Sequence, residues 1–420
     1  RPRPTAVGRS AHRSVRGLRA CAGRWRSESR EKRASAAALL DKRRPERPVR
    51  GLRPHAAGRA ARWFLDKFPG DVAYAYKANN SVFLIGALYG AGIRHFDVAS
   101  LPEIEDAASI PDAQLHFMHP VKSPHAISRA YDMGVRSFAL DGEDELEKIL
   151  AATNNARDLL LWVRLAVPAI NSRIPLERKF GIAGPEAARL LMKTRQSAAE
   201  LGLTFHVGSQ TTTPDAFVTA LGEVQKLIVK AGVVIDRLDI GGGFPSRYPD
   251  SEPAPMQTFM DTILADIEEL SVRENVRLMC EPGRALVAEA ESLIVRVDAR
   301  RDHNLYINDG SYGMLFDAAH LGFIFPTRIV GREIEKAEAL EPFELWGPTC
   351  DSIDYMKGPF MLPASTQVGD YIEIGNTGAY GRAIAGHFNG YGEYDEVILL
   401  DEPMLTMYDA EVAAQRSARR

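Results

Sequence analysis

One unit recurs along the chain from residue 72: a short apolar run, a polar or glycine end, and then a segment compatible with a helix. The apolar runs are Val72–Lys77, Ile93–Val98, Gln114–His119, Val135–Leu140, Leu159–Leu165, Thr204–Val207, Arg237–Ile240 and Val276–Glu281. The helical segments between them include Ser81–Tyr89, Asp144–Ala152, Pro185–Leu201, Pro214–Ala231 and Pro255–Ser271. Strands that alternate with helices form parallel βα units. Eight units in about 210 residues predict an α/β fold, a closed (β/α)8 barrel of the TIM type.

Each apolar run ends in residues that can carry chemistry. The eight ends supply Lys77, Asp97, His119, Asp141, Arg164, His206, Gly241–Gly243 and Glu281. Barrel enzymes build their active sites at the carboxyl ends of the strands. One polar strand end means little, but eight of them on one rim predict a site there.

The sequence changes character after Arg284. Strands are indicated at Leu286–Val297, Leu305–Asn308, Glu344–Trp346 and Asp370–Ile374, with few long helices between them. We therefore predict a barrel over residues 62–284 and a mostly-β domain over residues 285–420.

Residues 1–61 form a basic N-terminal segment. The first 62 residues hold 19 basic side chains against 4 acidic ones and show no sustained apolar period. Such a composition does not bury enough apolar surface to offset the entropy of ordering, so we predict disorder, or a start that is not the natural N-terminus. A transit peptide and a nucleic-acid-binding arm are alternatives.

The remaining 358 residues hold 33 basic and 51 acidic side chains, which disfavours nucleic acid as a partner. Three cysteines, Cys21, Cys280 and Cys350, are too few for a disulfide framework and favour a reducing cytoplasm. The longest apolar run, Leu159–Ile170, contains Arg164 and is too short to span a bilayer, so we expect no membrane association. The ten histidines lack the spacing of metal ligands, so we predict no metal site.

Lys77 ends an apolar strand in the run Ala75-Tyr76-Lys77-Ala78-Asn79. Burial would lower the pKa of its ammonium and suit the amine to forming a Schiff base. A lysine that pairs with a carboxylate such as Asp97 is equally compatible with the pattern.

Three further motifs indicate anion or cofactor contacts. Gly241-Gly242-Gly243 would let backbone N–H groups approach a phosphate, although a glycine run also suits a tight turn. Arg284 would add a charged phosphate contact. Glu281 would keep a pyridine nitrogen protonated, or else pair with Arg284 at the rim. His206 is followed by Gly208 and Ser209, which offer another anion contact, although isolated histidines are more often structural.

The second domain contains a cysteine motif, Gly347-Pro348-Thr349-Cys350-Asp351. A cysteine between proline and aspartate in a loop is a candidate acid or nucleophile. Cys280 lies within an apolar strand and is expected to be a packed core thiol.

Five motifs together resemble the fold-III pyridoxal 5'-phosphate (PLP) decarboxylases, which have an alanine racemase-like barrel, and most closely their ornithine/lysine decarboxylase branch. In order, they are Tyr74-Ala75-Tyr76-Lys77-Ala78-Asn79, Phe205-His206-Val207-Gly208-Ser209, Asp239-Ile240-Gly241-Gly242-Gly243-Phe244-Pro245, Glu281-Pro282-Gly283-Arg284 and Trp346-Gly347-Pro348-Thr349-Cys350-Asp351. The resemblance runs from about Phe64 to Leu400.

This resemblance implies roles at the cofactor. Lys77 would bind PLP covalently, His206 would stack on the ring, and Glu281 would pair with the pyridine nitrogen. Asp97 and Arg164 match residues near the lysine and the ring. The phosphate would be held by Ser209, Gly241, Gly242, Gly243, Arg284 and Tyr380.

The resemblance also implies roles at the substrate. Family members are head-to-tail homodimers in which each active site is built from two chains. Cys350 and Asp351 would then reach the partner's cofactor, and Cys350 would protonate the carbanion left after CO2 departs. The distal ammonium of a diamino acid would be received by Asp317 and Asp351, with Tyr312 lining the same pocket.

Two departures from the family accompany this resemblance. Tyr76 stands where relatives have a small aliphatic residue. Pro45–Arg62 shows neither the apolar strand nor the helix that precede the lysine strand in the family, so we expect the β domain to lack a strand.

The predicted reaction is decarboxylation of L-ornithine to putrescine and CO2 in polyamine biosynthesis, with L-lysine as an alternative that differs by one methylene. Diaminopimelate and arginine decarboxylases carry other residues around the cysteine, so Pro348-Thr349-Cys350-Asp351 disfavours them. A non-catalytic regulatory homologue tolerates loss of the lysine or the phosphate ligands, and all of them are present here.

Overall fold

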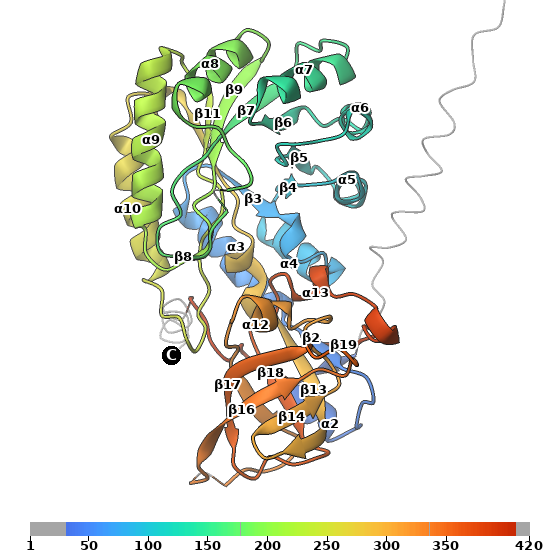
Figure 1. Ribbon diagram of the computed structural model, residues 1–420. Coiled ribbons are helices and arrows are strands. Elements are labelled where there is room, and N and C mark those ends of the chain that lie inside the picture. Colours follow the sequence, from blue (N-terminus) through green and yellow to red (C-terminus); the bar gives the residue numbers. More distant parts are fainter. Residues whose placement is uncertain (1–30, 177, 336, 409–420) are drawn as a thin grey trace, which may run out of the picture.

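The computed structural model describes residues 31–176, 178–335 and 337–408. Eight strands form the barrel in the upper half of Figure 1: β3 (Asp71–Ala75), β4 (His95–Val98), β5 (Gln114–Phe117), β6 (Ser137–Leu140), β7 (Leu160–Leu165), β9 (Glu200–Phe205), β11 (Arg237–Asp239) and β12 (Arg277–Cys280). They pair in this order, all parallel, and β12 pairs with β3 to close the ring. The predicted (β/α)8 barrel is confirmed.

Helices connect successive strands: α4 (Val82–Ala91), α5 (Leu101–Ala107), α6 (Pro124–Asp132), α7 (Glu143–Ala152), α8 (Gly184–Arg195), α9 (Asp215–Ala231) and α10 (Met256–Glu268), with a short turn η2 (Arg273–Asn275) before β12. Ser100 and Ser123 cap α5 and α6 by accepting hydrogen bonds from backbone N–H groups of the first turn. A small two-stranded antiparallel sheet of β8 (Ser172–Ile174) and β10 (Ser209–Thr211) stands outside the barrel. Among the described residues, no helix combines the length and apolarity needed to cross a membrane.

Several predicted element boundaries are wrong. The first strand ends at Ala75, so Lys77 lies in a 3-10 turn, η1 (Tyr76–Ala78). The helix predicted to reach Leu201 ends at Arg195, because β9 already begins at Glu200. The predicted strand Leu286–Val297 starts as two helical turns, α11 (Arg284–Val287) and η3 (Ala288–Ala290), before β13 begins. A short apolar run does not by itself distinguish a buried helical turn from a strand.

The second region, in the lower half of Figure 1, is built on one nine-stranded sheet and confirms the predicted mostly-β part. Its strands are β1 (Lys32–Arg33), β2 (Val49–Leu52), β13 (Glu291–Arg301), β14 (Asn304–Ile307), β15 (Thr327–Val330), β16 (Leu340–Trp346), β17 (Tyr355–Pro363), β18 (Tyr371–Ile374) and β19 (Asp395–Leu399). Short helical pieces complete it: α2 (Ala36–Leu40), α12 (Phe316–His320), α13 (Gly381–Ile384) and η4 (Phe388–Gly390).

The prediction for the N-terminal segment is wrong from residue 31 onward. β2 lies between β13 and β19, so the strand that was expected to be missing is present. The helix α3 (Pro54–Lys67) follows and packs against α4 and α11. Its buried face is rich in alanine, which gives little apolar signal in a sequence but lets helices approach closely. Residues 1–30 of the predicted disordered segment lie outside the described residues.

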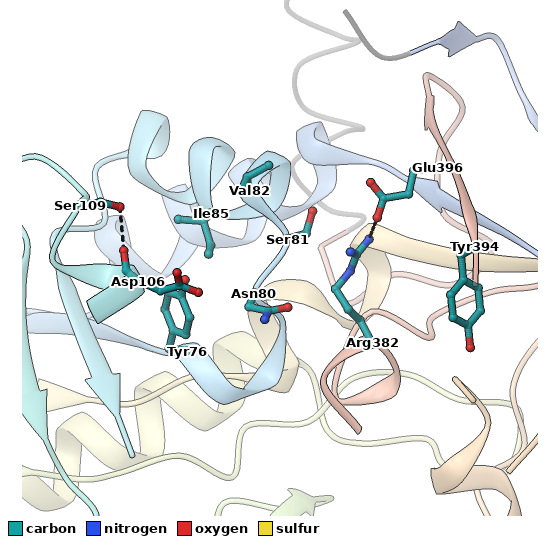
Figure 2. Close-up of a pocket in the computed structure, with 10 residues that line it drawn as sticks. All are labelled: Tyr76, Asn80, Ser81, Val82, Ile85, Asp106, Ser109, Arg382, Tyr394 and Glu396. Atoms are coloured by element: carbon teal, nitrogen blue, oxygen red, sulfur yellow. Dashed lines mark hydrogen bonds and ion pairs between the residues drawn. The ribbon is translucent and has the colours of Figure 1, made fainter. Parts of the chain in front are cut away.

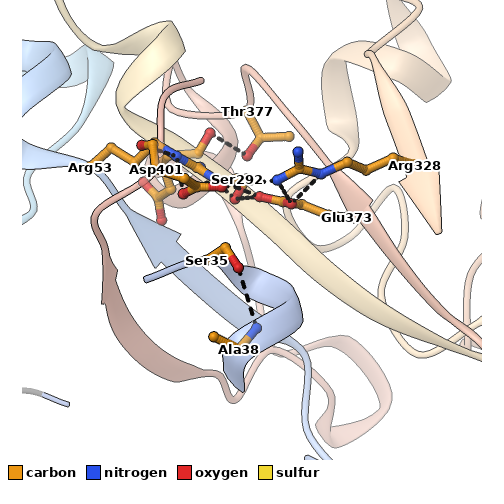
Figure 3. Close-up of polar contacts among 9 residues, drawn as sticks. Ser35, Ala38, Arg53, Ser292, Arg328, Glu373, Thr377 and Asp401 are labelled. Carbon is orange, nitrogen blue, oxygen red and sulfur yellow. Dashed lines mark hydrogen bonds and ion pairs between the residues drawn. The ribbon is translucent and has the colours of Figure 1, made fainter. Parts of the chain in front are cut away.

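Arg53, which the sequence placed in a solvated basic segment, is buried where β2 leads into α3. Its Nη2 lies 2.8 Å from Oε1 of Glu373 and 2.9 Å from Oδ1 of Asp401, and Nη1 donates to Ser292 Oγ at 2.9 Å. Arg328 approaches the other carboxylate oxygen of Glu373 at 2.6 Å (Figure 3). A buried guanidinium needs such partners, so this network fixes the joint between the sheet and the barrel.

Candidate active site

Lys77 and Asp97 meet at the carboxyl ends of β3 and β4. Nζ of Lys77 donates to Oδ2 of Asp97 at 2.8 Å, and Asp97 is buried. Burial opposes the charged lysine, but the charges of Asp97, Tyr380 and Glu281 outweigh it and raise the pKa of Lys77. The expected lowering of this pKa is therefore wrong, and the alternative pairing of Lys77 with Asp97 is present. The physical reason is the Asp97 carboxylate, which favours the ammonium.

Lys77 also borders open space, since 43% of its side chain is exposed. A cavity of about 430 Å³ is lined by Tyr76, Lys77, Glu103 and Tyr380, among others. A second cavity, of about 470 Å³, lies beside it between η1, α4 and the β domain (Figure 2). Tyr76 and Asn80 line both cavities, so the aromatic residue that departs from the family pattern forms part of the wall between them.

Glu281 and Asp239 form a buried acidic pair under the rim. Burial raises the pKa of both groups, Asp239 to about 7. The charge of Asp239 raises the pKa of Glu281 further, whereas a hydrogen bond with Glu281 partly offsets the rise at Asp239. Thr204 Oγ1 donates to Asp239 at 2.6 Å and so fixes its orientation. Oε1 of Glu281 is buried and accepts no hydrogen bond within the described residues. Asp239 was not predicted as a site residue, although its place before the glycine run was a usable signal.

His206 lies at the end of β9 with its ring against the glycine turn. The N–H of Gly208 donates to its Nδ1 at 3.1 Å, and a Cβ on Gly242 would stand 3.0 Å from its Nε2. Burial, followed by the charges of Arg164 and Lys77, keeps the pKa of His206 well below its usual value. The imidazole is therefore neutral at pH 7, and Arg164 shares the rim with it.

The three glycines form a turn that side chains would block. Gly241 has φ +67° and Gly243 has φ +116°, and a Cβ on Gly243 would lie 2.6 Å from the carbonyl oxygen of Gly208. The Gly241 N–H donates to Asp239 at 2.9 Å, so it is not available to a ligand. Only the N–H groups of Gly242 and Gly243 are then left for a phosphate, and Ser209 begins β10 nearby.

Arg284 is buried at the start of α11 and is held from two sides. Nη1 donates to the hydroxyl of Tyr248 at 2.9 Å, and Nη2 lies 3.1 Å from Oδ2 of Asp317. The Tyr380 ring centroid is 5.1 Å from its Cζ, and its Nε is buried without a partner among the described residues. The alternative pairing of Arg284 with Glu281 is therefore absent. Tyr248 carried no sequence signal, because it follows β11 in a loop and packs against the β-domain rings of Phe323 and Phe325.

Asp317 thus has a partner other than a substrate. It was predicted to receive the distal ammonium, but in the structure its carboxylate pairs with Arg284. Its role toward the substrate stays a prediction.

Tyr312, Cys350 and Asp351 come together on two loops of the β domain, the Tyr312 loop (residues 309–315) and the Cys350 loop (residues 347–354). The Tyr312 hydroxyl donates to Oδ2 of Asp351 at 2.6 Å. This bond lowers the pKa of Asp351 and raises that of Tyr312 to about 12. Cys350 is exposed, with its Sγ 3.3 Å from Oδ1 of Asn389. Within the described chain, no hydrogen bond or ion pair joins these three residues to Lys77 or Arg284.

Comparison with known proteins places this geometry in a family. The family described as pyridoxal-dependent decarboxylase, pyridoxal binding domain, matches residues 56–288. The lysine/ornithine decarboxylase of Selenomonas ruminantium is 32% identical over 79% of this chain and 84% of its own length. Antizyme inhibitor 2 of Xenopus laevis is 33% identical over 76% of this chain and 73% of its own. The crystal structure of the Paramecium bursaria Chlorella virus arginine decarboxylase has a TM-score of 0.77 at 26% identity, covering 86% of this chain and 98% of that one.

The chain therefore belongs to the fold-III PLP-dependent decarboxylases of basic amino acids. The residues at the rim fit this cofactor. The buried, unpartnered Oε1 of Glu281 can accept the N–H of a protonated pyridine ring, and the buried Nε of Arg284 and the glycine turn suit a phosphate.

Proposed function

We propose that this protein decarboxylates a basic diamino acid, with L-ornithine as the preferred substrate and putrescine and CO2 as products. The observation that carries the proposal is the buried carboxylate of Glu281, which has an unpartnered oxygen at the same rim as the accessible amine of Lys77. A buried acceptor without a partner destabilises the fold. A homologue that no longer bound the cofactor would therefore gain nothing from keeping this carboxylate.

Bound PLP supplies a ring that accepts the electrons left when a bond at the α-carbon breaks. The side chains of this protein divide the remaining work. Lys77 would bind the cofactor, and Glu281 would hold the ring nitrogen protonated. His206, kept neutral by burial, would pack on the ring face without adding a charge. Asp97 and Arg164 would surround the lysine, while Ser209, Gly242, Gly243, Arg284 and Tyr380 would hold the phosphate.

The distal end of the substrate would meet Asp351. Its carboxylate accepts from Tyr312 and from the backbone N–H of Ile353, and the Tyr312 bond favours the ionised form. An ammonium is the complementary partner for this group. Cys350, the neighbouring residue on the same loop, would deliver the proton to the α-carbon after CO2 leaves. An exposed free thiol in this role favours a reducing compartment such as the cytoplasm.

The two halves of the site would come from different chains of a homodimer. Ile353, Phe388 and Tyr391 are large apolar side chains that are exposed on or beside the Cys350 and Tyr312 loops. Phe388 also packs on Tyr312 with ring centroids 4.6 Å apart. A second copy of the chain that covered this surface would bury the apolar groups. It would also bring the rim of its own barrel against the two loops.

Steady-state kinetics of the PLP-loaded protein on L-ornithine, L-lysine, L-arginine and diaminopimelate test the proposal. We expect kcat/KM for ornithine to exceed that for lysine by about tenfold or more, since one methylene in a fitted pocket is worth 10- to 200-fold. Asp351→Asn should raise KM for ornithine while PLP binding is unchanged. A preference for arginine or diaminopimelate would contradict the substrate assignment. Tight PLP binding without turnover of any of the four would instead favour a regulatory role.

A further inference from the structure

The last residue of the Cys350 loop, Asp354, is a buried carboxylate that contacts the Tyr312 loop. Asp354 is 1% exposed. Its Oδ1 accepts hydrogen bonds from the backbone N–H and the hydroxyl of Ser311, at 2.6 and 2.9 Å. Its Oδ2 accepts from the backbone N–H and the hydroxyl of Thr349, at 3.1 and 2.7 Å. Each oxygen therefore holds one loop.

The backbone of both loops is shaped around this carboxylate. A Cβ on Gly310 or on Gly347 would overlap the Asp354 carboxylate oxygens. The Gly347 N–H also donates to the Asp354 carbonyl at 2.9 Å, and the Asp354 N–H donates to the Asp351 carbonyl at 3.1 Å. Glycine at both positions lets the backbones of the two loops approach the Asp354 side chain closely.

The number of donors matches a carboxylate and no other side chain of this size. An ionised carboxylate offers about four lone-pair sites, and here two hydroxyls and two backbone N–H groups point at them. An amide would keep one acceptor oxygen and place an NH2 group against the other pair of donors. Replacement by asparagine would thus release one loop and keep the other.

We propose that Asp354 is a positioning residue that fixes Tyr312 and Asp351 relative to each other, and with them Cys350. The loops are tied twice, by Asp354 in the interior and by the Tyr312–Asp351 hydrogen bond toward the surface. Without the Asp354 contacts, the Tyr312–Asp351 hydrogen bond would be the remaining side-chain hydrogen bond between the two loops. This inference rests on the proposed function for its kinetic consequence, but not for its structural one.

Asp354→Asn is the main test, with Thr349→Val as a milder change that removes a single donor hydroxyl. We expect Asp354→Asn to raise KM for ornithine about tenfold, as for loss of a buried hydrogen-bond partner, and Thr349→Val to raise it a few-fold. PLP affinity should stay within twofold of the wild type. The matched control is Asp370→Asn. Asp370 is a buried β-domain aspartate that lies 2.9 Å from Arg332 and belongs to neither loop, so this variant should leave KM unchanged.

A double-mutant cycle separates positioning from general loosening of the fold. If Asp354 acts through Asp351, the effect of Asp354→Asn on KM should largely vanish in an Asp351→Asn background. Additive effects, or an unchanged KM, would overturn the proposal.

A readout that does not need turnover keeps this inference distinct from the proposed function. In the wild type, Tyr312 should titrate near its raised pKa of about 12, because its hydroxyl donates a hydrogen bond to the Asp351 carboxylate and so holds its proton more tightly. The negative charge of Asp354 also raises the pKa of Tyr312 directly, so this readout uses Thr349→Val, which keeps the carboxylate. The variant should shift the titration toward 10, followed by NMR of labelled tyrosine with Tyr312→Phe to assign the signal. If no diamino acid is decarboxylated but the titration shifts, the positioning role stands and the proposed function fails. A titration that does not move would overturn the positioning role.

Discussion

The barrel rim and the β-domain loops hold their polar groups in contrasting ways. At the rim, burial dominates: it raises the pKa values of Glu281 and Asp239 and lowers that of His206. On the loops, hydrogen bonds dominate, and Cys350 is exposed. Glu281 and Asp239 at the rim are thus buried and held in place before a ligand binds, whereas Cys350 on the loops is exposed to solvent. In the homodimer that we propose, a second copy of the chain would cover these loops.

Replacing Lys77 should have the largest effect. Lys77→Ala removes the accessible amine at the rim, and we expect activity to fall by more than about a thousandfold, as for loss of a catalytic nucleophile. Borohydride reduction of the PLP-loaded wild type, followed by peptide mapping, should place the cofactor on Lys77.

Lys122 provides the contrast within the same barrel. Burial lowers its pKa to about 8, yet its ammonium is fully enclosed, lies 2.9 Å from Oε1 of Glu145 and donates to the carbonyl of His119 at 2.9 Å. A lowered pKa without access should leave it unlabelled. Label on Lys122 would show that the rim around Lys77 is not the cofactor site.

Mixed dimers test whether rim and loops meet across two chains. Lys77→Ala and Cys350→Ala homodimers should each be nearly inactive. After equal amounts are mixed and re-equilibrated, about half of the dimers are mixed and each has one intact site, so activity should recover to about a quarter of wild type. A mixture that stays inactive after confirmed subunit exchange would place both residues within one chain's site.

The sequence predicted the rim better than the segments that support it. Lys77, His206, Glu281 and Arg284 follow apolar strands, and the barrel repeat alone brings such ends together. By contrast, α3 buries alanines and Arg53 is a buried charge, so neither shows in an apolar period. Contacts such as Tyr248 with Arg284 depend on the path of loops, which no local pattern records.

The joint between the two regions should be sensitive to Arg53. Arg53→Ala leaves the buried carboxylate of Glu373 with Arg328 as its remaining cation and should lower the free energy of unfolding by about 3–5 kcal/mol. Arg47→Ala is the matched control, since Arg47 and Glu393 form an exposed pair at 2.8 Å that should contribute less than about 1 kcal/mol. Chemical denaturation measures both. Equal, small losses would mean that the N-terminal strand does not couple the sheet to the barrel.

The smallest expected effect concerns Asp317, a β-domain residue that reaches the rim. Its carboxylate and the Tyr248 hydroxyl hold Arg284 in one orientation, which leaves the buried Nε for another acceptor. A guanidinium that is already ordered loses less freedom when it binds a phosphate. We therefore expect Asp317→Ala to weaken PLP binding about tenfold, or about 1.4 kcal/mol. Pyridoxal, which lacks the phosphate, should bind equally well to the variant and to the wild type in equilibrium titrations followed by absorbance.

Two other results would assign Asp317 differently. Tighter PLP binding by Asp317→Ala would mean that its negative charge repels the phosphate more than its contact orders Arg284. Unchanged PLP binding with a raised KM for ornithine would make it a substrate ligand, as the sequence resemblance implies. Tyr248→Phe, which removes only the hydroxyl that contacts Arg284, should reproduce a weaker form of the Asp317→Ala effect. If it does, the rim owes part of its order to the β domain, and the two regions are one site even within a single chain.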